Sequence, residues 1–165
     1  MNKFKMTIAA LTMASLLLTG CSKDSTGNTS GASDATVESV STKTPAEKTA
    51  ELMAQLELPE MAEVPSDMLF AYYGIDNADV KEMSAYRVGS GAFPDQFGIF
   101  VAVDAAAAER VKTCVEAYVE SERNGFMDYT PNEMYKFEDC FVKISDTTVY
   151  YAVCADNAKA ETILR

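Results

Sequence analysis

The segment Gln96-Phe97-Gly98-Ile99-Phe100-Val101-Ala102-Val103-Asp104 decides the fold. Apolar side chains occupy both alternating sets of positions along it, so we expect a strand that is buried on both faces. Such a strand lies in the middle of a sheet. Asp104 then provides an N-cap, which predicts that the longest helix follows over residues 105–123 and ends at Asn124-Gly125.

Three further strands are predicted on either side of this pair of elements, over residues 80–88, 138–145 and 148–154. The last two are joined by a tight turn at Asp146-Thr147, and a final helix begins near Asn157. Short connections favour antiparallel pairing, with the helices collected on one face. The predicted order is therefore strand, strand, helix, strand, strand, helix, around a four-stranded antiparallel sheet.

Two short helices are predicted to precede the sheet. Thr44-Pro45-Ala46-Glu47 combines a capping box with proline at the first helical position, and the helix that follows ends before Pro59. Its predicted buried stripe consists of Ala46, Ala50, Met53 and Ala54. The second helix covers residues 67–73 and is closed by Gly74. The predicted fold class is α+β, a single small domain over residues 45–165 with helices packed mainly on one face.

The N-terminus has the layout of a secretory signal peptide. Asn2-Lys3-Phe4-Lys5 is positively charged, and residues 6–18 form an uncharged run that is shorter than the roughly 20 apolar residues of a membrane span. Leu18-Thr19-Gly20-Cys21 follows and resembles the lipobox of bacterial lipoproteins. The resemblance implies cleavage between Gly20 and Cys21 and a diacylglyceryl group on the Cys21 sulfur. More than one acyl chain gives a stable membrane anchor.

These features divide the chain into three parts. Residues 1–20 are the predicted signal peptide, residues 21–44 the lipidated cysteine with a Ser/Thr/Gly-rich tether, and residues 45–165 the domain. The tether has no sustained apolar period and is predicted to be disordered. We therefore expect a protein that is lipid-anchored in the cell membrane and faces the extracytoplasmic side.

The chain is strongly acidic. It has 14 basic and 25 acidic residues, which gives a net charge of −11. Removal of residues 1–20 removes two lysines, so 14 − 2 = 12 basic residues remain and the charge becomes 12 − 25 = −13. This charge repels nucleic acid and favours a soluble monomer. The predicted partners are the membrane, through Cys21, and a protein, peptide or cell-wall ligand.

The chain contains no histidine. Histidine-based catalytic triads and histidine-ligated zinc are therefore excluded. Gly89-Ser90-Gly91 lacks the lysine of a phosphate-binding loop. The carboxylates of Asp76, Asp79 and Glu82, and those of Glu138-Asp139, fit neither a calcium loop nor a defined acid pair, and we interpret them as turn and strand-end residues. The sequence predicts no catalytic residue, metal or cofactor.

Phe93 is the single residue that we predict to be exposed for contact with a partner. It lies between Gly91 and Pro94 in the loop before the central strand, where packing forces burial least. Tyr72, Tyr73, Tyr86 and Tyr129 could also line a groove, but most of them are predicted to be core residues because the apolar sheet faces must be covered.

The cysteines of the domain could be paired or free. A two-residue turn in the last hairpin sets Cys140 opposite Val153, whereas a longer loop or a bulge sets it opposite Cys154 and permits a disulfide. Cys114 lies on the buried stripe of the long helix. We predict that all three thiols are reduced and buried.

Residues 65–75 (PSDMLFAYYGI), 97–104 (FGIFVAVD) and 126–131 (FMDYTP) together resemble a family of bacterial lipoproteins described as domain of unknown function 4358. The resemblance extends over most of the chain from residue 64 onward. It implies lipoprotein status and brings no activity with it.

Two classes of function remain. The tether, followed by a domain without a catalytic set, favours a non-catalytic binding or interaction module at the cell envelope. The alternative is a small envelope enzyme or a thiol-redox protein that uses Cys114, Cys140 or Cys154. These cysteines lack the Cys-x-x-Cys spacing of thioredoxin-like proteins.

Overall fold

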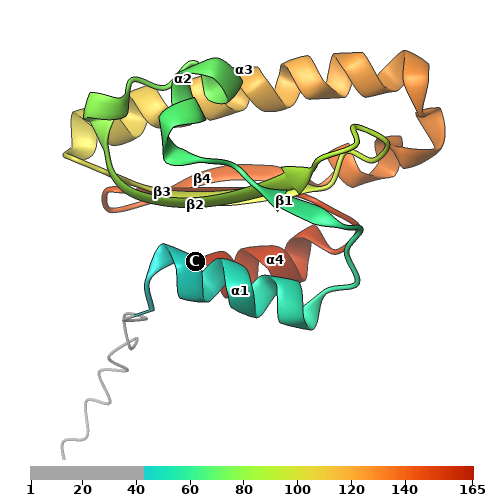
Figure 1. Cartoon of the computed structure of the whole chain (residues 1–165), viewed down its shortest axis with the longest axis horizontal. Helices are drawn as coiled ribbons and strands as arrows, with labels where there is room; N and C mark the ends of the chain where they lie inside the picture. Colours follow the sequence, from blue (N-terminus) through green and yellow to red (C-terminus); the bar gives the residue numbers. More distant parts are fainter. Residues whose placement is uncertain (1–42) are drawn as a thin grey trace, which may run out of the picture. The chain divides into compact units, whose positions relative to one another are not determined.

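A computed structural model describes residues 43–165 of the chain (Figure 1). The signal peptide, the lipobox with Gly20 and Cys21, and nearly all of the tether lie outside the described residues. The described residues form one five-stranded antiparallel sheet with strand order β1-β2-β3-β5-β4. Its strands are β1 (Met61–Glu63), β2 (Val80–Val88), β3 (Gln96–Ala102), β4 (Phe141–Ser145) and β5 (Thr148–Val153).

The α+β class and the antiparallel sheet are as predicted, and β3 is the central strand. The prediction of four strands is wrong by one, because β1 adds an edge strand beside β2. Its three residues are half-buried or exposed, so no apolar alternation marks it in the sequence.

Helices cover both faces of the sheet, so the prediction that they pack mainly on one face is wrong (Figure 1). One face packs against α2 (Leu69–Tyr73), α3 (Ala105–Tyr129) and the 3-10 helix η3 (Pro131–Phe137). The other face packs against α1 (Pro45–Gln55) and α4 (Asn157–Leu164). Two further 3-10 turns, η1 (Ser66–Met68) and η2 (Asn77–Asp79), precede α2 and β2 respectively.

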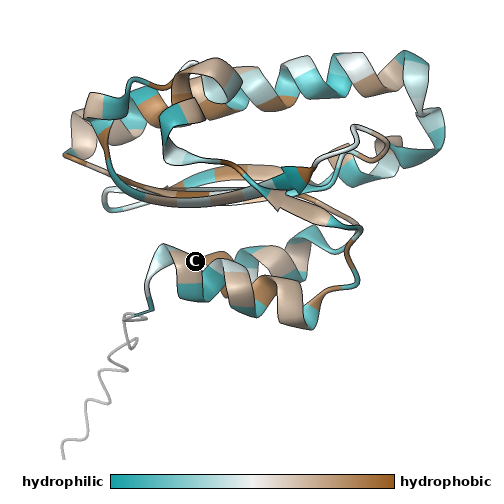
Figure 2. Ribbon diagram, viewed as in Figure 1, coloured by the Kyte–Doolittle hydropathy of each residue, from teal (hydrophilic) through white to brown (hydrophobic). Residues whose placement is uncertain are grey.

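The composition of β3 explains why helices cover both faces of the sheet. Phe97 and Ile99 point to the α1–α4 side, whereas Phe100 and Ala102 point to the α3 side, and all four are fully buried. A strand that is apolar on both faces needs a helix layer on each face to keep both sets of side chains from water. Figure 2 shows the strands mainly in brown, while α3 carries much teal.

The first helix begins as predicted and buries a different stripe from the one predicted. The Thr44 hydroxyl accepts from the Glu47 N–H at 3.3 Å, and a Glu47 carboxylate oxygen accepts from the Thr44 N–H at 2.8 Å. The inward side of α1 consists of Pro45, Lys48, Thr49 and Leu52. Lys48 is buried because its ammonium donates to the Leu164 carbonyl at 3.0 Å, at the end of the neighbouring helix α4.

The long helix continues past its predicted end. α3 runs through Asn124-Gly125 to Tyr129 and stops at Thr130, the residue before Pro131. A residue that precedes proline is disfavoured in the helical region, which accounts for the observed end. The extra turns carry Phe126 and Tyr129 to the end of the sheet where β2 finishes.

The final hairpin has the two-residue turn, one of the two alternatives that the sequence left open. Ser145 pairs with Thr148, and Asp146 adopts a φ of 54°. Phe141 pairs with Ala152, so the same register sets Cys140 in line with Val153 and out of line with Cys154. Cys114, Cys140 and Cys154 are free thiols, but the prediction that all three are buried is wrong, because Cys114 and Cys140 are half-buried and only Cys154 is buried. No helix within residues 43–165 has the length and apolar character needed to cross a membrane.

Candidate functional site

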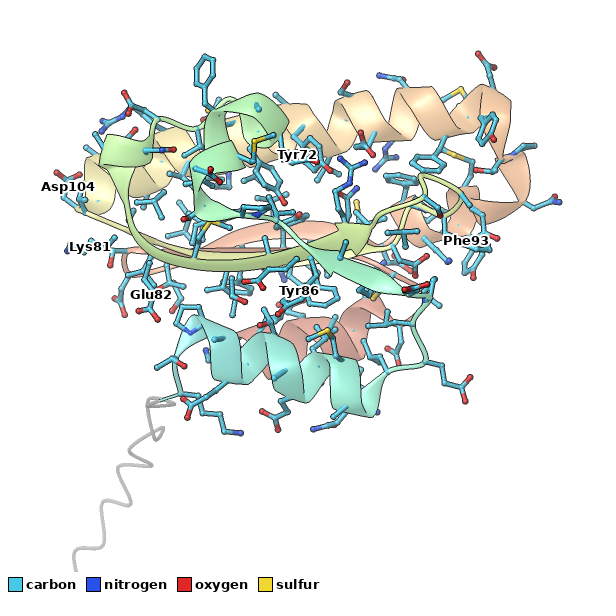
Figure 3. The ribbon with its side chains drawn as sticks, in the orientation of Figure 1. Tyr72, Lys81, Glu82, Tyr86, Phe93 and Asp104 are labelled. Atoms are coloured by element: carbon cyan, nitrogen blue, oxygen red, sulfur yellow. The ribbon has the colours of Figure 1, made fainter. Side chains whose placement is uncertain are left out.

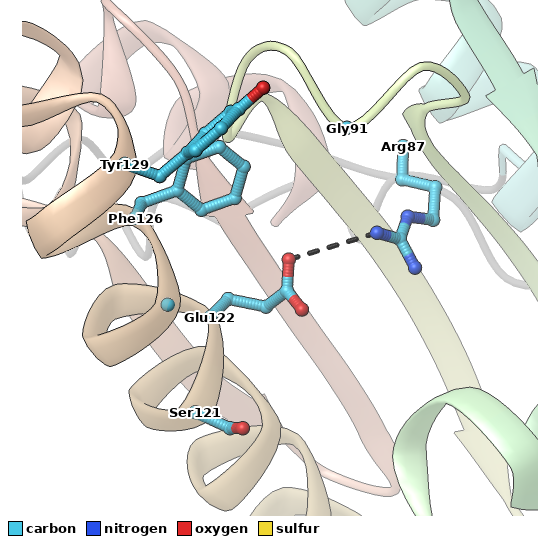
Figure 4. A pocket seen from close by; sticks show the side chains of 7 residues that line it. Arg87, Gly91, Ser121, Glu122, Phe126 and Tyr129 are labelled. Carbon is cyan, nitrogen blue, oxygen red and sulfur yellow. Dashed lines mark ion pairs between the residues drawn. The ribbon is translucent and has the colours of Figure 1, made fainter.

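A pocket of about 260 Å³ lies between the C-terminal half of α3, the end of β2 and the loop over residues 89–95 (Figure 4). Two of its lining side chains are charged, two are aromatic, and two residues are glycines. The lining residues are Arg87, Gly91, Ser121, Glu122, Gly125, Phe126 and Tyr129. Every one of them lies within the sequence between the start of β2 and the end of α3.

Strand and helix periodicity bring the two charges together. Ala85 points toward α3, and Arg87, two residues further along β2, must point the same way. On α3, Tyr118 faces the sheet, and Glu122 follows it one turn later on the same stripe. The carboxylate therefore faces the guanidinium across the space between sheet and helix, as Figure 4 shows.

The charged pair is loose. The closest approach of Arg87 Nη2 and Glu122 Oε2 is 3.7 Å, and the side chains remain 26% and 24% exposed. A charge-assisted hydrogen bond measures about 2.7–2.9 Å, so neither group is fully satisfied by the other. The Arg87 guanidinium also lies over the ring of Tyr72 in α2, 5.1 Å from its centroid. This contact supports the flat side of the guanidinium.

Two glycines keep the pocket open. Gly91 has a φ of 66°, which lets the loop turn beside the pocket at a conformation that other residues adopt with strain. Gly125 lies inside α3, and a Cβ at this position would meet no atom within 4 Å. Gly125 is exposed and lines the pocket, so the space beside it is open and not packed core.

A group of buried tyrosines lies behind the charged pair. The hydroxyls of Tyr73 and Tyr151 are hydrogen-bonded at 2.8 Å, and the ring of Tyr118 packs edge-on against Tyr73 at 4.6 Å. Burial raises the pKa of Tyr73 to about 12. Burial, the neighbouring Tyr73 and the Glu122 carboxylate raise the pKa of Tyr118 far above its usual range. These hydroxyls are therefore protonated at neutral pH and can donate hydrogen bonds.

Two buried polar groups near Arg87 have no hydrogen-bond partner within the described part of the chain. The Tyr118 hydroxyl is one of them, on a side chain that is 8% exposed. The other is the amide of Gln96, a residue that is 1% exposed and is the cross-strand partner of Arg87. Cross-strand partners share a sheet face, so Gln96 lies on the α3 side next to Arg87. A buried polar group without a hydrogen-bond partner lowers the stability of the folded state. The Tyr118 hydroxyl and the Gln96 amide can therefore each form a further hydrogen bond.

Three exposed aromatic side chains lie on the loop over residues 89–95, the end of α3 and η3, and we call them the aromatic rim: Phe93, Tyr129 and Tyr135. Their exposed fractions are 43%, 74% and 51%, respectively. Tyr135 lines a separate hollow beside α4 and not the pocket. Phe93 and Tyr135 both lie against the Lys136 ammonium, at 5.5 and 5.8 Å from their ring centroids. Tyr129 lines the pocket opposite Gly91. Figure 3 places Phe93 at the η3 end of the sheet, far from Glu82 and Asp104.

The loop that carries Phe93 is held by a buried ion cluster. The Lys136 ammonium contacts Asp95 at 2.6 Å and Glu133 at 2.7 Å, and the Lys136 and Asp95 side chains are 7% and 2% exposed. Burial alone would lower the pKa of Lys136, but the bonds to both carboxylates raise it above its ordinary value. The exposure predicted for Phe93 is confirmed, and its role as a contact residue stays a prediction.

The carboxylates that the sequence singled out lie elsewhere. Asp79 is bound by the Arg110 guanidinium, with Nε to Oδ2 at 2.9 Å, and Asp76 accepts from the Ala78 N–H at 2.9 Å. Glu138-Asp139 borders a separate hollow beside α4. Among residues 43–165, no three histidine, cysteine or carboxylate side chains are placed to hold a metal ion.

The three thiols occupy different environments. Cys154 is buried, and burial raises its pKa to about 11. Burial also raises the pKa of Cys140, although Arg123 lies 3.6 Å from its sulfur. Cys114 is half-buried, and its thiol donates to the Gly74 carbonyl at 3.6 Å. A thiol with a raised pKa is a weak nucleophile at neutral pH.

A model of the family described as domain of unknown function, DUF4358, matches residues 54–154 of the chain. The chain belongs to the DUF4358 family. The match begins within α1 and ends just after β5, so all five strands of the sheet and the whole pocket belong to the DUF4358 region. No curated protein matches the chain, and no solved structure matches it either.

Sequence reasoning missed Arg87 and Glu122 of the pocket, and it favoured a core position for most of the aromatic group that includes Tyr129, which is 74% exposed. A signal existed for the first, because Arg87 falls on the inward set of β2 positions, where an apolar residue is expected. Glu122 continues the apolar stripe of α3 as a charged residue. An opposite charge on each of two inward faces indicates a pair, but only the packing of α3 on the sheet shows that the two meet.

Proposed function

We propose that this protein is a membrane-anchored extracytoplasmic lipoprotein whose domain is a non-catalytic binding module at the cell envelope. The anchor is the acylated Cys21, and the tether over residues 21–44 carries the domain. The observation behind the binding role is the exposure of the three side chains of the aromatic rim, one of which, Tyr129, lines the pocket. Exposed aromatic side chains are typical of contact sites, because they bury a large area at low entropic cost.

The chemistry of the pocket supports binding over catalysis. Its charged groups are a guanidinium, which stays protonated, and a single carboxylate. A general acid–base pair or an activated nucleophile would need a second titratable group within reach. The raised pKa values of Cys140 and Cys154 argue against the thiol-redox alternative.

Site-specific photocrosslinking in intact cells tests the proposal. A photoreactive phenylalanine analogue replaces Phe93 in the full chain, and a matched variant carries it at Thr162, an exposed residue of α4 away from the pocket. We expect a discrete adduct from position 93 in the membrane fraction and none from position 162. Tyr129→Ala and Tyr135→Ala should each weaken the adduct. Equal labelling at positions 93 and 162 would show that the aromatic rim is not the contact surface. An adduct at position 93 that neither tyrosine substitution weakens would show the same.

A further inference from the structure

The charged groups of the pocket are available to a ligand. At 3.7 Å apart and about a quarter exposed, Arg87 and Glu122 lack the close contact of a satisfied pair. The guanidinium carbon lies 5.1 Å from the centroid of the Tyr72 ring, and a guanidinium carries five N–H donors. A ligand can therefore bond to both side chains without first breaking a strong ion pair.

The charge pattern selects the kind of ligand. A carboxylate alone is attracted by Arg87 and repelled by Glu122, and the net charge of −11 also disfavours anions. An ammonium group alone is attracted by Glu122 and repelled by Arg87. A molecule with a carboxylate and an ammonium group on one carbon satisfies both side chains at once. An α-amino acid has this arrangement.

The walls of the pocket match the remainder of such a molecule. Phe126 and Tyr129 supply an aromatic surface for an apolar side chain. The volume of about 260 Å³ lies below the range of drug-sized sites and suits a single amino acid. Gly125 keeps this space open, since a Cβ there would project into it without touching protein.

The interior next to the pair adds donors. The Tyr118 hydroxyl and the Gln96 amide have no partner among residues 43–165, and both are more than nine-tenths buried. The Glu122 charge acts on Tyr118, and Gln96 is the cross-strand partner of Arg87. Both groups therefore lie in the interior behind Arg87 and Glu122, and neither group lines the pocket itself.

We infer that the Arg87–Glu122 pocket binds the zwitterionic head of a free amino acid with an aromatic or large aliphatic side chain. Arg87 holds the carboxylate, Glu122 holds the ammonium group, and Phe126 with Tyr129 holds the side chain. This assignment rests on the proposed binding function and names the ligand class of the same end of the domain.

A set of four related probes tests the charge requirement. Saturation-transfer NMR titrations of the full chain compare L-phenylalanine with N-acetyl-L-phenylalanine, L-phenylalaninamide and N-acetyl-L-phenylalaninamide. The first keeps both charges, the next two lose one each, and the last loses both. At about 10 mM ligand, a site with a Kd of about 1 mM is about nine-tenths occupied. We expect saturable binding of L-phenylalanine, and a loss of about tenfold to a hundredfold for each missing charge.

Two variants assign each charge to its side chain. Glu122→Gln should bring the affinity for L-phenylalanine down to that for the N-acetyl compound, because the ammonium group no longer meets a carboxylate. Arg87→Gln should likewise bring the affinity for L-phenylalanine down to that for L-phenylalaninamide, because the carboxylate of the ligand no longer meets a guanidinium. A purely structural defect would weaken all four probes alike. Gly125→Leu should abolish binding, whereas Asn124→Leu, with the same side chain one position away on the exposed surface, should retain it.

Equal affinities for the four probes, or no saturable binding of L-phenylalanine at about 10 mM by the wild-type chain, would overturn the inference. These results need no variant, so a variant that fails to fold leaves the test decisive. If L-phenylalanine does not bind but the adduct at position 93 forms, the amino-acid pocket is rejected and the interaction module stands. A successful titration with no crosslink would reject the interaction module and keep the pocket.

Discussion

Replacement of Gly98 by alanine should destabilise the domain strongly. Gly98 lies in β3 between Ala85 of β2 and Tyr151 of β5, which are its cross-strand partners on either side. A Cβ on Gly98 would lie 2.8 Å from the Ala85 Cβ and 2.8 Å from the Tyr151 Cε1. Both distances are shorter than any ordinary carbon–carbon contact, so neighbouring atoms must move.

Neither neighbour can move freely. The Ala85 Cβ is fixed to the backbone of β2, which is hydrogen-bonded on both sides. The Tyr151 ring is fully buried, and its hydroxyl is bonded to that of Tyr73 at 2.8 Å. Overpacking costs about 1–3 kcal/mol, and loss of the buried hydrogen bond adds about 1 kcal/mol. The expected loss is therefore about 2–4 kcal/mol, or roughly 6–20 °C in Tm.

Urea unfolding followed by circular dichroism measures this loss, and Gly125→Ala is the matched control. The control makes the same chemical change in an open helical position, so it should raise the free energy of unfolding by up to about 1 kcal/mol. In an Ala85→Gly background, Gly98→Ala should cost less, because one of the two close contacts is gone. A cost below about 0.5 kcal/mol, within the range of ordinary surface substitutions, would refute the steric argument.

Three further predictions concern charge and location. Lys136→Met leaves Asp95 charged, buried and unpaired, and should cost about 3–5 kcal/mol in urea unfolding; a loss below about 1 kcal/mol would contradict this. The bond from Arg110 lowers the pKa of Asp79 below its ordinary value of 3.8, so its contribution to stability is present above that pH and is lost as the pH falls through the folded-state pKa. The stability difference between wild type and Arg110→Gln should therefore shrink below about pH 4. Cys21→Ala should move the protein out of the membrane fraction or leave an uncleaved precursor, and a mature-sized membrane-bound variant would disprove the anchor.

Features set by neighbouring residues were predictable from the sequence. The capping box at Thr44 and Glu47, the central position of β3 and the tight turn after Ser145 all agree with the structure. Each depends on a few adjacent side chains or on a simple period. The exposure of Phe93 belongs to the same class, because glycine and proline on either side hold it in a loop.

Features set by distant contacts were not predictable in the same way. The inward face of α1 contains Lys48, a residue that a hydrophobic pattern assigns to water. It is buried because the carbonyls at the end of α4 accept from its ammonium, and these lie more than a hundred residues away in the chain. The edge strand β1 likewise exists through pairing of Met61–Glu63 with β2, not through its own pattern. The Arg87–Glu122 pair likewise depends on the packing of residues that are far apart in the chain.

Gly125 shows why a local rule failed at the candidate site. A glycine that ends a helix usually adopts a positive φ, but among residues 43–165 only Gly74, Gly91 and Asp146 do so, and Gly125 is helical. Glycine inside a helix costs about 1 kcal/mol relative to alanine, and nothing within 4 Å prevents an alanine here. Packing therefore does not explain why the less stabilising glycine occupies this helical position. It is explained if the open space beside Gly125 is used, since local sequence rules are broken most often at functional positions. Gly125→Ala should then gain stability and lose affinity for L-phenylalanine, whereas a pocket without a function would show the gain alone.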